Sequence, residues 1–491
     1  MQRAADPSAA PHHDRRWLIL GIIGIAQLMV VLDVTIVNIA LPSAQQDLGF
    51  SDDDRQWVIT AYALAFGSLL LLGGRIADLF SRKWTFVVGL LGFAGASALG
   101  GAAQSFDLLV AARALQGVFG AMLAPAALSL LATTFTDPAE RGKAFGIYAG
   151  IAGAGGAIGL LLGGALTEVL DWRWCLYVSV LFAVPAAIAG TRLLHHAPAT
   201  SRSRLDLPGA LTVSAGLFAL VFGLARAESD GWGDPVTLGF LIGSAVLLVA
   251  FVAVQRRVAH PLLPLRVVTD RDRGASFLAI GTASAGLFGL FLFLTFYLQD
   301  TKGFTPLETG LAFLPMSFSI APTVGIVSTR VLARTGPRPL VPAGMLTAGL
   351  GMVLLTRIGV DTGYATHVLP SLILIGVGFG LTVAPSFAIA TAVRAQDSGV
   401  ASGLVNTSQQ IGGSIGTALL STLAASAATD FVTDRGPVPE VLRQAAVEGY
   451  TTAFWWAAGI FALGALVCGS LLRPGTRPEL AHGAEPATAR A

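Results

Sequence analysis

The sequence contains few charged residues. Asp, Glu, Lys and Arg make up only 12% of its 491 residues, against about 25% in soluble domains. Hydrophobic residues make up 54%, and the mean hydropathy is +0.70. This composition excludes an ordinary soluble domain and predicts an all-α, polytopic membrane protein.

Several other features are scarce. The two cysteines, Cys175 and Cys468, both lie in apolar runs, so no disulfide framework is predicted. Lysine supplies only 3 of the 31 basic residues, a bias that points to a high-GC bacterial genome. No GxxxxGK[ST] loop is present, which argues against ATP as a direct driver. There is no HExxH motif and no intramembrane cluster of His or carboxylates, so we expect no enzyme, no metal and no cofactor.

What the sequence does have is long apolar runs, since about 20 apolar residues cross a bilayer. We count fourteen, with approximate ends at 17–41, 57–74, 84–103, 106–132, 143–166, 174–194, 207–225, 236–254, 275–298, 309–329, 340–356, 367–392, 400–425 and 450–472. With the N-terminus inside, 23 basic residues fall on the inner side and 7 on the outer side. The positive-inside rule therefore predicts that both termini are cytoplasmic.

An internal repeat divides the chain. Residues 399–420, GVASGLVNTSQQIGGSIGTALL, align without a gap with residues 142–163, GKAFGIYAGIAGAGGAIGLLLG. Such a parallel repeat predicts two pseudo-symmetric six-helix bundles with a substrate path between them. The expected parts are a tail at 1–16, a bundle at 17–194, a linker at 195–274 with two inserted helices (207–225 and 236–254), a bundle at 275–472 and a tail at 473–491.

Two charges lie well inside predicted spans, Asp33 in the first and Arg113 in the fourth. An intramembrane charge is costly, so each is a functional candidate. Both should lie roughly 10–12 Å below the outer surface, from the 1.5 Å rise per residue. We therefore expect them to face each other, directly or through water, with protonation of Asp33 loosening the pair. The alternative is a static ion pair that only fixes helix packing.

Uncharged polar residues and glycines form a second set of candidates. Polar side chains at Gln27, Thr35, Asn38, Gln116, Asn406 and Gln410 are expected to line the substrate cavity or to join helices by hydrogen bonds. Glycines at Gly155, Gly159, Gly163 and Gly164 should let another helix, such as one of the opposite bundle, approach and rock. A tight cytoplasmic turn at Gly74, Asp78, Arg82 and Lys83 could make ion pairs that close the inner side.

At these residues the chain resembles the major facilitator superfamily, and most closely its fourteen-span drug:proton antiporters. Residues 32–42, LDVTIVNIALP, look like the first-helix signature of that family. Residues 74–83, GRIADLFSRK, resemble the superfamily's cytoplasmic gate motif, and Arg113 with Gln116 resembles the motif implicated in proton coupling. Residues Gly159, Gly163 and Gly164 resemble the antiporter motif, although Leu160 stands where that motif has proline, and Leu79 and Ser81 depart from the gate motif.

The resemblance implies a proton-coupled efflux transporter that exports a hydrophobic or amphipathic, antibiotic-like compound by alternating access. Asp33 would accept the proton, with Arg113 as its electrostatic partner. A proton-coupled or facilitative importer or symporter is the alternative, which Leu160 leaves open. We expect the small-molecule substrate, protons and the lipid bilayer as partners, no nucleic acid, a monomer, and a location in the bacterial cytoplasmic membrane.

Overall fold

The computed structural model describes residues 15–51, 54–135, 138–194, 206–258, 261–393, 398–436 and 438–473. Every regular element within these ranges is a helix. Residues 1–14 and 474–491 of the predicted tails, the start of the predicted linker and the side chain of Asp78 fall outside the described part.

Six long helices form the first group. Their bounds are α1 (Arg16–Leu48), α2 (Gln56–Leu79), α3 (Arg82–Gly101), α4 (Phe106–Thr134), α5 (Pro138–Val169) and α6 (Trp174–Leu193). The middle of the chain forms α7 (Leu207–Ser229), α8 (Pro235–Arg257) and the short α9 (Leu265–Thr269).

The remaining elements form the second group. Their bounds are α10 (Arg271–Phe296), η2 (Tyr297–Thr301), α11 (Pro306–Ile326), η3 (Val327–Val331), α12 (Leu332–Thr335), α13 (Pro337–Leu355), η4 (Tyr364–Val368), α14 (Leu369–Ala390), α15 (Ser398–Arg435) and α16 (Pro439–Leu471). The three η elements are single π-helical turns at the ends of long helices.

Twelve helices within the described ranges are long and apolar enough to cross a membrane. The described apolar parts of α2 and α5, Gln56–Leu70 and Ile158–Val169, are shorter. α8 has little of its surface buried within the protein, and a row of large apolar side chains on it is exposed. Such a helix is stable where lipid covers its outer face. The protein is therefore an all-helical membrane protein.

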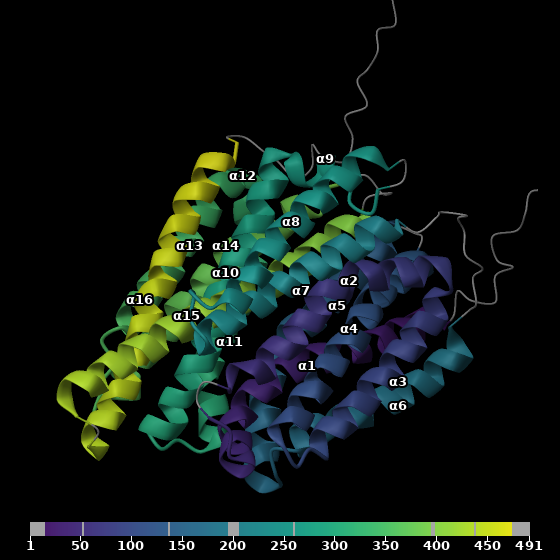
Figure 1. Cartoon of the computed structure of the whole chain (residues 1–491). Helices are drawn as coiled ribbons and strands as arrows, with labels where there is room; N and C mark the ends of the chain where they lie inside the picture. The colour runs from purple at the N-terminus through teal and green to yellow at the C-terminus, as the bar shows by residue number, and fades with distance from the viewer. Residues whose placement is uncertain are drawn as a thin grey trace, which may run out of the picture.

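The two groups pack in the same order. α1 packs on α5 as α10 packs on α15, and α2 packs on α4 as α11 packs on α14. The contacts between groups repeat as well, because α5 packs on α11 and α15 on α2. Figure 1 shows α1 to α6, purple to blue, beside α10 to α16, whose colour runs from teal through green to yellow. α7 contacts both α2 and α15 and so bridges the groups.

The helices extend further than the apolar runs. α15 continues to Arg435 and α16 begins at Pro439, beyond the apolar runs predicted at 400–425 and 450–472. Polar residues after an apolar run end the hydropathy signal without ending the helix. At 1.5 Å per residue the 38 residues of α15 span roughly 57 Å, more than the thickness of a bilayer core.

Candidate functional site

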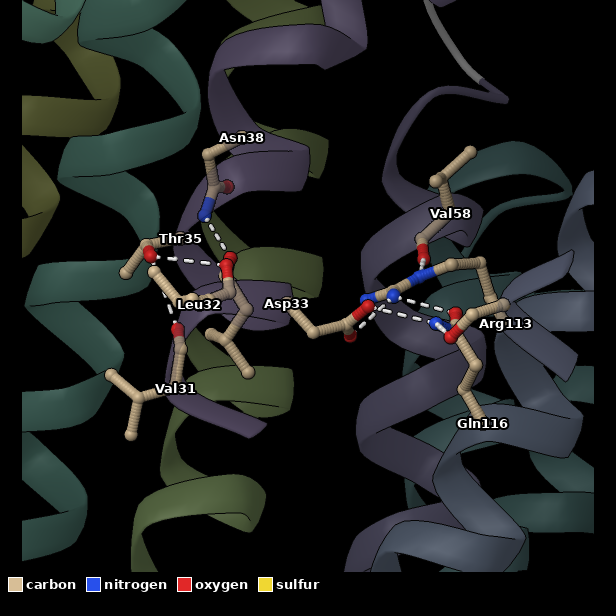
Figure 2. Close-up of polar contacts among 10 residues, drawn as sticks. Val31, Leu32, Asp33, Thr35, Asn38, Val58, Arg113 and Gln116 are labelled. Atoms are coloured by element: carbon tan, nitrogen blue, oxygen red, sulfur yellow. Dashed lines mark hydrogen bonds and ion pairs between the residues drawn. The ribbon is translucent and has the colours of Figure 1, made fainter. Parts of the chain in front are cut away.

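Asp33 and Arg113 form a direct ion pair inside the first group of helices. Arg113 Nη1 lies 2.6 Å from Asp33 Oδ2, and the two side chains are 2% and 0% exposed, respectively. Asp33 comes from the middle of α1 and Arg113 from α4. Figure 2 shows the two side chains pointing toward one another. The sequence thus correctly indicated that these two charges would meet.

Gln116 closes this pair into a ring. Its Nε2 donates to Asp33 Oδ1 at 2.8 Å, while its Oε1 accepts from Arg113 Nη1 at 2.8 Å. The same Nε2 donates to Ser97 Oγ at 2.7 Å, which brings α3 into the network. Gln116 lies three residues after Arg113 on α4, so both side chains share one helix face. We call Asp33, Arg113, Gln116 and Ser97 the ion-pair ring.

The backbone of α2 holds Arg113 from the other side. Arg113 Nε donates to the carbonyl oxygen of Val58 at 3.1 Å, and its guanidinium lies 4.7 Å from the ring centroid of Tyr62. A Cβ on Gly117 would lie 2.5 Å from the carbonyl oxygen of Tyr62. Only glycine therefore lets α4 come close enough to α2 for these contacts.

The electrostatics of the ring follow from burial. Two charges out of water are stable only when their mutual attraction and further hydrogen bonds offset desolvation. Here Arg113 donates to one carboxylate oxygen of Asp33 and Gln116 to the other, and the guanidinium also has the Val58 carbonyl and an aromatic face. Charge-assisted bonds of this kind are about twice as strong as neutral ones.

A small cavity reaches Arg113 from the end of the bundle that carries Trp172, which we call the Trp172 end. Its volume of about 10 Å³ has room for roughly one water molecule. Apart from Arg113, its lining is almost entirely apolar: Val37, Ala40, Leu41, Ala44, Val58, Leu109, Trp172, Cys175 and Leu176. It is too small to hold a drug-sized substrate, which needs about 300 Å³ or more.

The other polar candidates on α1 lie away from the ring. Figure 2 shows Thr35 and Asn38 on a different side of α1 from Asp33. Thr35 Oγ1 donates to the carbonyls of Val31 and Leu32, and Asn38 Nδ2 to that of Val34 at 2.7 Å. These bonds stay within α1 and turn both side chains toward its own backbone.

The remaining polar candidates are spread over three helices. Gln27 Oε1 accepts a hydrogen bond from the Tyr148 hydroxyl of α5. Gln410 is 8% exposed on α15, where the Cβ position of Gly67 on α2 lies 3.3 Å from its Cβ. Asn406 lies one turn before it on α15. The structure therefore places Gln116 inside the ion-pair ring, whereas Asn406 and Gln410 lie on α15.

The glycines of α5 contact two different neighbours. Added Cβ atoms at Gly155 and Gly159 would meet Val31 and Thr35 of α1, and at Gly163 they would meet Ile36. This face therefore packs within the first group, and not on the opposite group as we expected. Four-residue spacing keeps the three on one face, whereas Gly164 is about 100° further round. A Cβ there would lie 2.6 Å from the Pro306 carbonyl of α11, in the opposite group.

Sequence reasoning missed Ser97, Tyr62 and the Val58 carbonyl. A single serine among apolar residues on α3 carries no signal of its own, and a backbone carbonyl carries none at all. Tyr62 could have been flagged as an aromatic side chain in an apolar run. Only its place on α2 beside Arg113 assigns it a role.

Comparison with known families decides the class of protein. The family model described as Major Facilitator Superfamily matches residues 23–417, which include the ion-pair ring and most of both helix groups. The chain belongs to the major facilitator superfamily. It is thus a multi-pass bacterial membrane protein of a transporter family.

Relatives and solved structures agree with this assignment. The chain is 51% identical over 484 residues to the puromycin resistance protein pur8 of Streptomyces alboniger, covering 96% of each chain. It is 37% identical to the cephamycin export protein CmcT of Amycolatopsis lactamdurans, covering 82% of this chain and 83% of that protein.

The fold is shared with a bacterial homologue of the human lysosomal transporter Spinster in an inward-facing, unoccupied conformation. The TM-score is 0.65 at 16% identity, covering 96% of this chain and 98% of that one.

In this superfamily member the turn between α2 and α3 is short. α2 continues to Leu79, so only Phe80 and Ser81 separate it from α3. The Ser81 side chain accepts from the Trp84 amide and so caps α3. Lys83 Nζ donates to the Thr191 carbonyl at 2.7 Å, and the Cβ position of Gly74 lies 3.4 Å from Pro125. Arg82 begins α3.

α5 of the transporter runs without a break from Pro138 to Val169, with Leu160 in its second half. A proline there would remove one backbone hydrogen bond and bend the helix. The carbonyl of Leu160 faces Gly310 of α11, where a Cβ would overlap it. The position of the motif's missing proline is thus a contact between the two helix groups.

Proposed function

We propose that the protein is a proton-coupled efflux transporter, which exports a hydrophobic or amphipathic, antibiotic-like compound by alternating access. Puromycin is the first candidate substrate, because the relative with 51% identity is named for resistance to it. The observation that carries proton coupling is the fully buried pair of Asp33 and Arg113. A buried carboxylate that takes up a proton loses its charge and so weakens its ion pair, which lets proton binding change how the helices pack.

The proposed topology has fourteen spans, with α2 and α5 completing the set. Residues 17–194 and 275–472 form the two halves, and α7 and α8 are the inserted pair. Both termini lie in the cytoplasm on the side of Lys83, so the Trp172 end faces outward. Gln27, Asn406 and Gln410 are proposed to contact substrate, and the transporter is proposed to work as a monomer.

Contacts between the halves support a state that is closed at the Trp172 end. Gln299 Nε2 of η2 donates to the Ile39 carbonyl of α1 at 3.1 Å. The Leu307 amide of α11 donates to Glu168 of α5 at 3.2 Å. Gly164 lies against the start of α11 nearby. With this end outward, the transporter would receive substrate from the cytoplasm in this state.

The direction of transport decides between exporter and importer. Purified protein is reconstituted into liposomes with an acidic lumen, and uptake of puromycin and of a panel of cationic, neutral and anionic compounds is measured. Proton exchange predicts uptake that disappears when the pH gradient is collapsed. Uptake only into vesicles with the opposite gradient would establish a symporter, the alternative that Leu160 keeps open, and uptake indifferent to the gradient would reject coupling.

A further inference from the structure

The amide of Gln116 has one orientation that suits its neighbours. Arg113 has only donors, and an ionised carboxylate has only acceptors. Gln116 therefore turns its oxygen to Arg113 Nη1 and its nitrogen to Asp33 Oδ1, both at 2.8 Å. A rotation of the amide by 180° would place two donors together and two acceptors together.

A proton on Asp33 conflicts with this arrangement. Oδ2 already accepts from Arg113 Nη1, and Oδ1 already accepts from Gln116 Nε2. A proton bound to either oxygen would thus point at a donor. The protonated carboxyl group needs an acceptor, and the one in reach is the oxygen of Gln116 after its amide has rotated.

Ser97 provides a hydrogen-bond partner for the amide of Gln116 before and after the rotation. A serine hydroxyl can both donate and accept. In this structure Ser97 Oγ accepts from Gln116 Nε2 at 2.7 Å. After rotation the same hydroxyl would donate to Gln116 Oε1, which would also accept from the protonated Asp33. Asp33, Ser97 and the oxygen of Gln116 therefore have partners in both orientations, whereas the NH₂ of Gln116 has acceptors only in the present one.

Arg113 loses a hydrogen-bond acceptor when the amide rotates. After rotation its Nη1 would face the amide NH₂ of Gln116 and a neutral carboxyl group, while its bond to the Val58 carbonyl stays available. In the part of the chain that the structure describes, two other titratable groups lie near it: Tyr62 on α2, beneath the guanidinium, and Cys175 on α6, across the small cavity. Neither supplies the missing negative charge while protonated.

We propose that Gln116 is a positioning residue that converts protonation of Asp33 into release of Arg113 by reversing its side-chain amide against Ser97. A hydronium ion delivers the proton: one of its O–H bonds breaks as the bond to Asp33 Oδ1 forms, and a water molecule is left. When the proton leaves, the amide returns and Arg113 is held again. This inference rests on the proposed function, since it explains how proton binding would reach the helices.

The test separates proton coupling from the transport cycle. Substrate exchange without a pH gradient needs no net proton movement, whereas accumulation driven by a gradient does. Gln116→Leu keeps the volume and removes the amide. We expect exchange of puromycin to stay within about twofold of wild type. Gradient-driven accumulation should fall about tenfold or more, because a hydrogen bond to a charged group changes an equilibrium by such a factor.

Ser97→Ala provides the second variant, in case Gln116→Leu does not fold. It removes the hydroxyl that has to reverse, so the pH at half-maximal transport should shift while exchange persists. Ser276→Ala is the matched control, since that buried serine donates to the Asp272 carbonyl of its own helix. It should leave the pH profile unchanged.

Two results would overturn the inference, and a third would overturn the proposed function on which it rests. A wild-type pH profile in Gln116→Leu and Ser97→Ala would reject the reversal. Equal losses of exchange and of gradient-driven transport would show a merely structural role. Wild-type transport that does not depend on pH would instead reject the proposed function itself. Asp33→Asn should in that case transport like wild type.

Discussion

Asp33 and Arg113 are each other's counter-ions in a site almost without solvent. Removing one of them leaves the other charge buried and unpaired. Such a loss typically costs about 3–5 kcal/mol, whereas replacing both charges is often neutral. Single and double variants can therefore separate the effect of the ion pair on stability from its effect on transport.

We expect Asp33→Asn to lower the free energy of unfolding by about 3 kcal/mol, measured by denaturation in detergent. The double variant Asp33→Asn with Arg113→Gln should recover most of that stability and still fail in gradient-driven uptake. Recovery of transport together with stability would mean that the pair is only a packing element.

Tyr62 offers a finer test at the same scale. Its ring lies under Arg113, but its hydroxyl has no hydrogen-bond partner among the described residues. Tyr62→Phe should therefore be neutral or slightly stabilising. Tyr62→Leu should cost about 1–2 kcal/mol through loss of the cation–π contact. Equal costs for the two variants would show that the hydroxyl has a partner in the working protein.

The ion-pair ring shows which residues of a site can be predicted from sequence. Asp33 and Arg113 could be found because charge in an apolar helix is expensive, and their depths follow from the helix rise. The hydrogen-bond partners of Gln116 could not be predicted, because an uncharged amide fits a ligand cavity and a buried network equally well. Its role depends on Ser97 from another helix, and helix packing is not encoded in any short motif.

Among the elements, α1 and α5 depend on each other through Gly159. A Cβ at Gly159 would overlap Thr35 Oγ1 and lie 3.0 Å from Thr35 Cβ, so the helices would have to move apart. Gly159→Ala should cost about 1–3 kcal/mol through overpacking. Gly156→Ala is the control, because nothing lies within 4 Å of its Cβ position.

The same contact predicts its own suppressor. Thr35→Ala removes the hydroxyl that a Cβ at residue 159 would meet, so the double variant should regain much of the lost stability in the same unfolding experiment. A control variant as unstable as Gly159→Ala would instead point to glycine's backbone flexibility along α5. The sequence marked these glycines as a packing face, but it could not tell which helix covers them.

Helix ends at this scale were the least predictable. The hydropathy of a run follows the bilayer, whereas helix formation follows backbone hydrogen bonding and caps. α2 therefore extends to Leu79 and α15 to Arg435, beyond the apolar stretches. The tight turn predicted between α2 and α3 is therefore only two residues long, Phe80 and Ser81.

Across the whole molecule, the halves meet backbone to backbone at α5 and α11. Gly164→Ala would place a methyl group 2.6 Å from the Pro306 carbonyl. We expect it to disfavour the state described here without unfolding either half. Spin labels at Val169 and Leu311, both exposed, would measure the separation in a variant whose native cysteines are replaced.

In wild-type protein these labels should report mainly the short distance, and Gly164→Ala should increase the population of longer ones. Transport should slow, since the Trp172 end closes less often. Gly156→Ala again serves as control and should leave the distance distribution unchanged. An unchanged distribution in Gly164→Ala would show that the two helices part and rejoin elsewhere.

The repeat predicted which helices correspond, and the packing order of the two groups follows it. The sequence also predicts that the buried pair of charges belongs to the first group alone. The position that corresponds to Arg113 is Ile373, a residue 41% exposed on α14. Symmetry in the backbone thus coexists with asymmetry in charge, which only the side chains reveal.

The contact of Gly164 with Pro306, and of Leu160 with Gly310, also limits how this protein can evolve. Every substitution of either glycine adds atoms where none fit, so mutation can only loosen this contact. Selection for tighter or looser closing must therefore act on neighbouring side chains, such as Gln299 and Glu168, which reach across the same gap. Descendants adapting to new compounds would keep the glycines and vary those residues.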